Sequence, residues 1–319
     1  MLDSSPLAFS VVICAYSDER WDDLLAAIAS VREQHLRPEQ IIVVIDHNPG
    51  LLDRLQQVGE PGITLIPNSQ QRGLSGARNS GIAAARGDVI AFLDDDAMAA
   101  PDWLRWLAEG YADKSVLGVG GDIQPLWLAD RPVWFPEEFN WVIGCSYRGM
   151  PTATAPVRNL LGANMSLRSE VFAAIGGFRH GMGRIGKTPL GCEETELCIR
   201  AVQRWPGSQF LYEPRATVRH RVPQARANWT YFRSRCYAEG LSKAQVARLV
   251  GPQNGLASER AYTTRTLPAA VVRGLAELAG RDAGGLRRAA AVIGGLAWTV
   301  MGYLRGALAG TANHRLQVA

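Results

Sequence analysis

The chain has 319 residues, 47 % of them hydrophobic and 20 % charged, which is enough for one large domain or two modest ones with a real core. Its five cysteines have no metal-type C-x-x-C spacing, and no basic stretch followed by an apolar one occurs near Met1. We therefore expect a globular protein of a reducing cytoplasm, with no secretory signal.

The net charge of +4 is unevenly distributed. Residues 200–319 carry 18 Lys and Arg against 5 Asp and Glu, whereas residues 1–199 carry 16 against 25. The basic part has no interleaved aromatic-basic stripe and no nucleic-acid motif. It therefore favours an anionic lipid surface over nucleic acid as a partner.

The first half of the chain alternates aliphatic runs with helical patterns. The runs that predict strands are Phe9–Ala15, Ile41–Ile45, Ile63–Ile66, Val89–Leu93 and Val116–Val119. The patterns that predict helices are Trp21–His35, Gly73–Arg86 and Pro101–Tyr111. Unbroken aliphatic strands in this alternation indicate an α/β fold, with a mostly parallel sheet covered on both faces.

Three consecutive aspartates, Asp94, Asp95 and Asp96, follow the predicted strand Val89–Leu93. Adjacent carboxylates repel one another and are costly to desolvate without a cation. Because ligands bind at the ends of parallel strands, this pattern favours a site for Mg²⁺ or Mn²⁺. The alternative is a solvated acidic turn before the helix that starts near Pro101.

Two segments between the predicted elements allow two interpretations each. The aromatic residues of 125–156, Trp141 among them, form either a packed excursion over a sheet edge or a wall that binds an acceptor. The Gly-rich segment Phe178–Gly191 is either a loop that orders over a ligand or a plain surface loop.

A helix is predicted over Cys192–Trp205, with an apolar stripe that includes Leu197 and Cys198. Helical spacing places Glu194 on the same inward face, whereas Glu196 and Arg200 are expected to form an exposed ion pair. A carboxylate on an inward face needs a partner or a chemical role, so Glu194 is a candidate functional residue.

The pattern after Val222 is helical and rich in Arg and Ala. Its apolar stretch Ala289–Leu304 would span only about 24 Å as a helix, short of the roughly 30 Å hydrocarbon core. We therefore expect it to lie on a membrane or against a partner rather than to cross the bilayer. The predicted division is a domain over 1–225 and a helical, basic, membrane-associated region over 226–319.

Several segments, in this order and spacing, carry a family resemblance. They are Val11–Tyr16, Ile42–Asp46, Asn68, Arg72–Gly81, Ala91–Asp96, Gly162–Arg168, Gly176–Phe178, Cys192–Arg200 and Val218–His220. The chain thereby resembles the family 2 glycosyltransferases over residues 9–221. The resemblance implies a GT-A fold, which is the fold of nucleotide-diphospho-sugar transferases, and inversion at the sugar carbon.

The resemblance also implies roles for individual residues. Those that would contact the nucleotide are Ala15, Tyr16, Asp46, Gly73, Arg78, Asp94 and Asp95. Those that would bind the metal are Asp96 and His220. Glu194 would be the general base, and Glu193 would help to place the acceptor. The donor or acceptor sugar would contact Asn164 and Trp141.

Each role has a structural alternative. His220 could be a strand-end surface histidine, Arg78 a helix ion-pair partner, and Asn164 a turn residue. Glu194 could act at a helix N-terminus, where acids are favourable. Two features depart from the family pattern, because Asp46 is followed by His47 and a glutamate stands at the base position where aspartate is common.

The expected function is a metal-dependent, inverting hexosyltransferase that uses Mn²⁺ or Mg²⁺. It would move a sugar from a nucleotide-diphosphate donor, with UDP favoured by the resemblance, to a hydroxyl of a glycan or lipid-linked acceptor. The expected location is cytoplasmic and peripheral on the inner face of the cell membrane. The alternatives are a nucleotidyltransferase acting on sugar phosphates and a non-catalytic membrane-associated scaffold. The sequence 15–20, after the first strand, has no glycine, which argues against the nucleotidyltransferase.

Overall fold

The computed structural model describes residues 7–184, 190–251, 253, 257–280 and 282–317. Its strands are β1 Phe9–Ala15, β2 Gln40–Ile45, β3 Ile63–Pro67, β4 Val89–Asp94, β5 Ala97–Ala99, β6 Val116–Trp127, β7 Ala155–Val157, β8 Asn164–Arg168 and β9 Gln209–Val222. Its α-helices are α1 Trp21–Arg32, α2 Pro49–Val58, α3 Leu74–Ala84, α4 Trp103–Gly110, α5 Ser169–Ile175, α6 Glu193–Arg204, α7 Trp229–Val250, α9 Ala257–Ala261, α10 Leu267–Ala279 and α11 Ala283–Gln317. The shorter helical segments are η1 Asp18–Arg20, η2 Glu137–Ile143, η3 Gln224–Arg226 and η4 Tyr262–Thr266.

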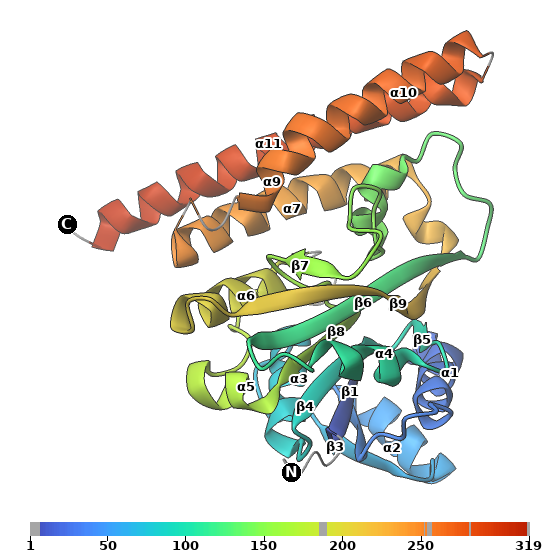
Figure 1. Cartoon of the computed structure of the whole chain (residues 1–319), viewed down its shortest axis with the longest axis vertical. Helices are drawn as coiled ribbons and strands as arrows, with labels where there is room; N and C mark the ends of the chain where they lie inside the picture. The colour runs from blue at the N-terminus through green and yellow to red at the C-terminus, as the bar shows by residue number, and fades with distance from the viewer. Residues whose placement is uncertain (1–6, 185–189, 252, 254–256, 281, 318–319) are drawn as a thin grey trace.

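The strands form one mixed sheet in the order β3-β2-β1-β4-β8-β6-β9-β5, with β7 paired to β9 (Figure 1). The first four strands are parallel, so their carboxyl ends lie at one edge. Ala15 pairs with Ile45, and Cys14 pairs with Asp94. Strand β8 then runs antiparallel to β4 and β6, whereas β9 runs parallel to β6. The predicted α/β fold with a largely parallel sheet is confirmed, together with its helical C-terminal extension.

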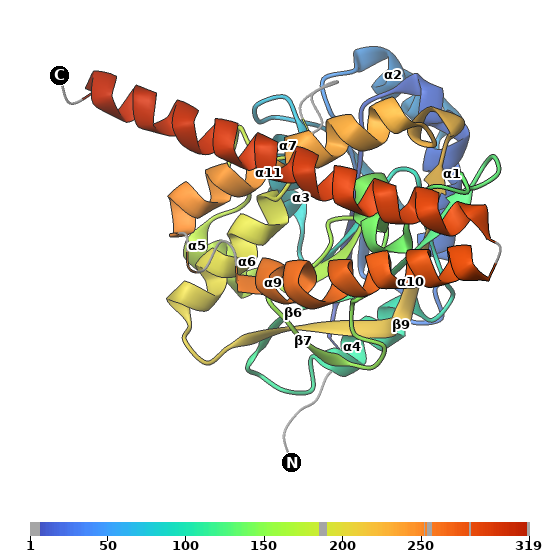
Figure 2. The ribbon, with the colours of Figure 1, turned by 90° about the horizontal axis from the view of Figure 1, so that it is seen from above.

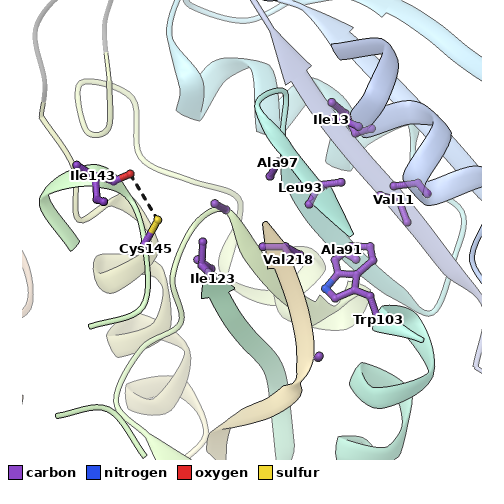
Figure 3. Close-up of a cluster of buried hydrophobic side chains, with 14 of the residues drawn as sticks. Val11, Ile13, Ala91, Leu93, Ala97, Trp103, Ile123, Ile143, Cys145 and Val218 are labelled. Atoms are coloured by element: carbon purple, nitrogen blue, oxygen red, sulfur yellow. Dashed lines mark hydrogen bonds between the residues drawn. The ribbon is translucent and has the colours of Figure 1, made fainter. Parts of the chain in front are cut away.

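Alternate residues of the parallel strands enter two separate hydrophobic clusters. Val11 and Ile13 belong to one cluster with Trp103 of α4, whereas Val12 belongs to the other, which packs under α5 and α6. Figure 3 shows the first cluster between β1, β4 and α4. Because both faces are buried, the strands are aliphatic throughout, as the sequence predicted.

Helices α7, α10 and α11 form a layer above the sheet (Figures 1 and 2). Helix α11 packs along both α7 and α10. Its contact with α7 is close because Gly302 faces the other backbone, and a Cβ at this residue would lie 2.0 Å from the Tyr237 carbonyl oxygen. The predicted division at residue 225 falls in η3 and stays a prediction.

The apolar stretch Ala289–Leu304 is only the middle of α11, which has 35 residues. The segment Ala283–Ala309 is long and apolar enough to cross a membrane by length and composition, and 28 % of its apolar window is buried. The expected shortness of this helix was therefore wrong. The arginines that flank the stretch do not end the helix, because Arg residues are favourable in helix interiors.

Candidate active site

A cavity of about 660 Å³ lies at the carboxyl edge of the parallel strands. The strand ends contribute Tyr16 after β1, Asp46 after β2 and the Asp94–Asp96 trio after β4. Helices α3, α6, α7, α9, α10 and α11 and the short segments η2 and η4 also line the cavity. The sheet topology therefore brings polar strand ends and the C-terminal helices to one cavity.

Asp94, Asp96 and His220 converge in this cavity, and one ligand atom from each lies within 4.8 Å of the others. Asp94 ends β4, whereas His220 is on β9 directly opposite Ala97 of β5. His220 Nε2 lies 3.1 Å from Asp96 Oδ1, and its Nδ1 lies 3.9 Å from Cys145 Sγ. His220 is buried, so the alternative of a surface histidine is wrong.

Two arginines that were not predicted as site residues bond the trio. Arg20 Nη1 lies 2.6 Å from Asp95 Oδ1 and 3.2 Å from Asp96 Oδ2. Arg226 Nη2 lies 3.1 Å from Asp96 Oδ2. Arg20 ends η1 and Arg226 ends η3, and each lies in a short turn between regular elements without a motif to mark it.

The cations around Asp96 control its ionisation. Burial opposes the charged form, but His220, Arg20 and Arg226 hold the pKa of Asp96 well below its usual range. Burial likewise opposes the charge on His220, yet Asp96 raises the pKa of His220 to about 10. The trio therefore has full negative charge at Asp96, as a cation site requires.

The carboxylate oxygens of the trio, together with the His220 ring nitrogen, are ligand atoms that fit a divalent ion. Asp95 Oδ2 is buried without a hydrogen-bond partner among the described residues, although buried oxygens are normally paired. Carboxylate oxygens with one imidazole nitrogen suit Mn²⁺, and carboxylate oxygens alone suit Mg²⁺. Asp94, Asp96 and His220 are thus the residues that would hold the metal.

Arg78 connects the trio to α6. It is only 2 % exposed, and its Nη1 lies 2.7 Å from Glu193 Oε1. Its Nη2 donates to the Gly162 carbonyl at 3.0 Å and lies 3.4 Å from Asp94 Oδ1. Arg78 is therefore an ion-pair partner that also lines the cavity, and its contact with the nucleotide stays a prediction.

Glu194 stands in the cavity wall at the first turn of α6. The preceding Cys192 has a left-handed backbone with φ +66°, which is rare for a residue other than glycine and marks local strain. Desolvation, followed by the charge of Glu193, raises the pKa of Glu194 to about 8. A half-buried carboxylate with a raised pKa is a suitable general base.

All of the predicted nucleotide residues except Gly73 line the cavity. Asp46 accepts from Asn68 Nδ2 at 2.6 Å and from the Gly73 amide at 2.9 Å, which ties the loop after β2 to the start of α3. Tyr16 is 41 % exposed, with the Arg20 guanidinium 5.5 Å from its ring. Ala15 also lines the cavity, beside Tyr16.

Some aromatic residues of 125–156 pack against the protein core, and others line the cavity. Trp134 and Phe135 pack against Phe232 of α7 with ring centroids 5.5 Å apart, as a packed excursion requires. Trp141 and Tyr147 instead line the cavity. The first pair of rings is therefore a packed excursion, whereas acceptor binding by the second pair stays a prediction.

Asn164 is a correction to the predicted sugar contacts. It is fully buried, its Oδ1 accepts from Trp103 Nε1 at 2.7 Å, and its Nδ2 donates to the Asp122 and Ala216 carbonyls. It does not belong to the cavity wall. Its amide joins β8 to α4, β6 and β9, so it stabilises the sheet and is not exposed to a sugar in the cavity.

Glu196 is a second correction, because it is fully buried rather than exposed. Its Oε1 lies 3.0 Å from Arg200 Nε and 2.5 Å from Arg179 Nε. The segment after α5 covers this face of α6, and Arg200 also bonds the Gly177 carbonyl at 2.8 Å. The predicted loop Phe178–Gly191 is described only in part, because residues 185–189 lie outside the described residues. In its described part, the Met182 carbonyl accepts a hydrogen bond from Ser75 Oγ at 2.8 Å.

Comparison with known proteins agrees with this geometry. A sequence model described as Glycosyl transferase family 2 matches residues 10–176. The chain is 36 % identical over 247 residues to a glucosyl-dolichyl phosphate glucuronosyltransferase of Haloferax volcanii, covering 76 % of this chain and 78 % of that protein.

Two solved structures share the fold. A mannosyltransferase from Pyrobaculum calidifontis in complex with GDP-Man and Mn²⁺ aligns with a TM-score of 0.58 and 15 % identity, over 93 % of this chain and 88 % of that one. GalNAc-T7 with UDP, GalNAc and Mn²⁺ aligns with a TM-score of 0.52 and 20 % identity, over 69 % of this chain and 45 % of that one. These comparisons support neither of the two alternatives, the nucleotidyltransferase and the scaffold. The chain belongs to glycosyl transferase family 2 and is a glycosyltransferase with the GT-A fold.

Proposed function

We propose that this glycosyltransferase is a metal-dependent, inverting hexosyltransferase that moves a sugar from a UDP-sugar to a hydroxyl of a lipid-linked acceptor. The observation that carries the proposal is one cavity that both the Asp94, Asp96 and His220 cluster and Glu194 line. A charge-binding group and a base in one cavity match the two needs of sugar transfer.

In this reaction Glu194 takes the proton from the acceptor hydroxyl while that oxygen forms a bond to the anomeric carbon of the donor. The bond from the same carbon to the diphosphate breaks, and the nucleoside diphosphate leaves. A divalent ion at the trio supplies Lewis-acid neutralisation of the leaving charge. Because the acceptor attacks from the face opposite the diphosphate, the anomeric configuration inverts.

The donor side of the cavity has residues suited to a nucleotide. Asp46 has a carboxylate fixed at a strand end, where it can accept from the base, and Tyr16 offers an exposed ring for stacking. Arg78, held by Glu193, is positioned beside Asp94 for the ribose and diphosphate. UDP is favoured by the family resemblance, and both UDP and GDP occur in the aligned structures.

The lipid-linked acceptor is supported by apolar side chains in the lining of the cavity. Leu267 of α10 and Leu296 and Val300 of α11 line it. Val300 is also 47 % exposed and continues an exposed apolar stripe on α11, which includes Leu286, Ile293, Leu304 and Leu308. Val300 therefore belongs both to the lining of the cavity and to this stripe. The curated relative in Haloferax acts on a dolichyl phosphate-linked sugar by its name.

The same stripe supports peripheral contact with an anionic membrane. The exposed Arg287 and Arg305 adjoin Leu286 and Leu304 of the stripe, and an apolar face with basic neighbours suits a helix lying in the lipid interface. Helix α11 is held along α7 and α10, so crossing the bilayer would break packed contacts. All five cysteines are free, in keeping with a reducing cytoplasmic side.

A donor screen tests the proposed function. The chain is incubated with UDP-, GDP-, ADP- and TDP-sugars with Mn²⁺, with Mg²⁺ or with EDTA, and thermal midpoint and nucleoside diphosphate release are measured. We expect a UDP-sugar with metal to raise the midpoint and to be hydrolysed slowly, with both effects lost in EDTA. Absence of shift and release with every nucleotide sugar would refute the function.

A further inference from the structure

A buried cluster of four charged side chains, which the catalytic chemistry does not use, lines the same cavity. Its members, here called the acceptor cluster, are Arg158, Glu239, Lys243 and Glu259. Lys243 Nζ lies 3.2 Å from Glu239 Oε1 and 2.6 Å from Glu259 Oε1. Arg158 Nη1 and Nη2 bond the two oxygens of Glu259 at 2.7 and 3.1 Å. Each side chain retains 15–20 % exposure, which is directed to the cavity that it lines.

The acceptor cluster is connected to the proposed base. Cys192, which directly precedes the Glu193–Glu194 pair, donates through Sγ to Glu239 Oε1 at 3.4 Å. The charge of Glu239 also contributes to the field at Glu194. A group bound at the cluster would thus lie near the carboxylate that accepts the hydroxyl proton.

Aromatic side chains complete this part of the cavity. The rings of Tyr147 and Tyr262 have centroids 5.3 Å apart and an interplanar angle of 77°. Trp141 Nε1 donates to the Tyr262 hydroxyl at 3.0 Å, which fixes the two rings relative to each other. The three rings line the same cavity as the acceptor cluster. Fixed aromatic faces beside polar groups suit a ligand with apolar faces and polar edges.

We propose that the acceptor cluster and these rings form a subsite for the terminal sugar ring of the acceptor, so that the enzyme extends a lipid-linked saccharide and does not glycosylate the bare lipid phosphate. This inference rests on the proposed function. Sugar hydroxyls both donate and accept hydrogen bonds, and the cluster offers carboxylate acceptors next to ammonium and guanidinium donors. Sugar C–H faces pack on the aromatic rings.

The two carboxylates of the cluster disfavour a phosphate. Arg158 bonds Glu259, and Lys243 bonds both Glu239 and Glu259, so an added phosphate would meet both carboxylates; the further cation that acts on Glu239 is Arg235, which also lines the cavity. A purely structural role explains the cluster less well, because a buried ion network is often no more stable than apolar side chains of similar size. The apolar lining at α10 and α11 then receives the lipid that follows the sugar.

The test compares acceptors that differ only in the sugar. The probes are short-chain isoprenyl phosphates that carry glucose, mannose, galactose, N-acetylglucosamine or glucuronic acid, and the same isoprenyl phosphate without sugar. We expect wild-type enzyme to transfer to at least one sugar-bearing probe, with kcat/KM at least 100-fold above that for the bare phosphate. Equal or better use of the bare phosphate, or transfer to no sugar-bearing probe, overturns the subsite.

A double variant, Lys243→Met with Glu259→Gln, tests the cluster residues while it preserves their net charge. We expect it to raise the acceptor KM at least tenfold and to leave the donor KM within twofold of wild type. The matched control is Glu213→Gln, which alters a buried carboxylate paired with Arg215 at 2.7 Å outside the cavity. An unchanged acceptor KM in the double variant, or an equal rise in the control, overturns the assignment.

Thermal midpoints distinguish misfolding from loss of binding. If the double variant melts far below wild type, Glu259→Gln alone and Lys243→Met alone replace it, and a folded single variant with wild-type acceptor KM overturns the proposal. Failure of the proposed function is a different result. In that case wild-type enzyme releases no nucleoside diphosphate from any nucleotide sugar, with or without an acceptor.

Discussion

Replacement of Glu194 by glutamine is the sharpest test of the chemistry. The side chain keeps its size and its place in the wall of the cavity, but it cannot accept a proton at neutral pH. General base catalysis contributes on the order of 10²- to 10⁴-fold in rate, so kcat of Glu194→Gln should fall by that factor. Donor binding should stay unchanged, because Glu194 lies on α6, whereas the proposed metal ligands Asp94, Asp96 and His220 belong to other elements.

The raised pKa gives this prediction a pH signature. With a pKa of about 8, only about a tenth of Glu194 is ionised at pH 7. Because the ionised form is the base, kcat/KM of wild-type enzyme should rise about tenfold between pH 7 and pH 9, and level off above pH 9. Glu194→Gln should lose this rise, whereas Glu194→Asp should keep it with a lower plateau.

Ionisation of Glu194 should raise the rate but lower the free energy of unfolding. The folded-state pKa of Glu194 lies above its unfolded value, so the folded state binds more protons and its stability declines as pH rises from about 4.5 to about 8. Glu194→Gln should therefore melt higher than wild type at pH 9. The control is Glu170→Gln, an exposed acid on α5. Near-wild-type turnover of Glu194→Gln, or a pH profile identical to that of wild type, would refute the reasoning.

Four further variants address the other parts of the structure. Asp96→Asn should abolish Mn²⁺-dependent UDP binding in calorimetry, and retained affinity would remove this residue from the metal site. Arg78→Met leaves the buried Glu193 without its partner and should cost about 3–5 kcal/mol in urea unfolding; a loss below 1 kcal/mol would argue against the pair. Gly302→Ala places a Cβ 2.0 Å from a carbonyl of α7 and should lower the thermal midpoint by several degrees, whereas an unchanged midpoint would contradict this close packing. Ile293→Glu, at a side chain 59 % exposed, should reduce sedimentation with phosphatidylglycerol vesicles, and equal sedimentation would count against membrane contact through this stripe.

The parallel half of the sheet could be predicted because each of its strands is buried on both faces. Val11, Val12 and Ile13 enter opposite clusters and are all aliphatic, so the strand is evident as a continuous run. Helix α2 was not predicted, although it has clear signals. Asn48 caps its start, Pro49 follows, and Gly59 ends it with φ +66°.

Residues of the candidate site could likewise be predicted only where local sequence patterns place them. The trio and Glu194 could be predicted, because a strand end and an apolar helical stripe place them by short-range spacing. Burial of Glu196 could not, since it depends on a segment from another part of the chain covering α6. Lys243 and Glu259 reach the cavity only through the packing of α7 and α9 over the sheet, and no local pattern distinguishes them from surface charges.

The charge balance of the trio explains how adjacent carboxylates can end a buried strand. In the structure Arg20, Arg226 and protonated His220 neutralise Asp95 and Asp96. A divalent ion held by His220 would require the ring to release its proton, because a ring nitrogen must present its lone pair. The ion would bring two positive charges where His220 carried one, and the diphosphate of a donor would bring the opposing negative charge. We therefore expect the charge of the acidic trio to be compensated both with and without the donor, so the trio need not destabilise the fold that positions it.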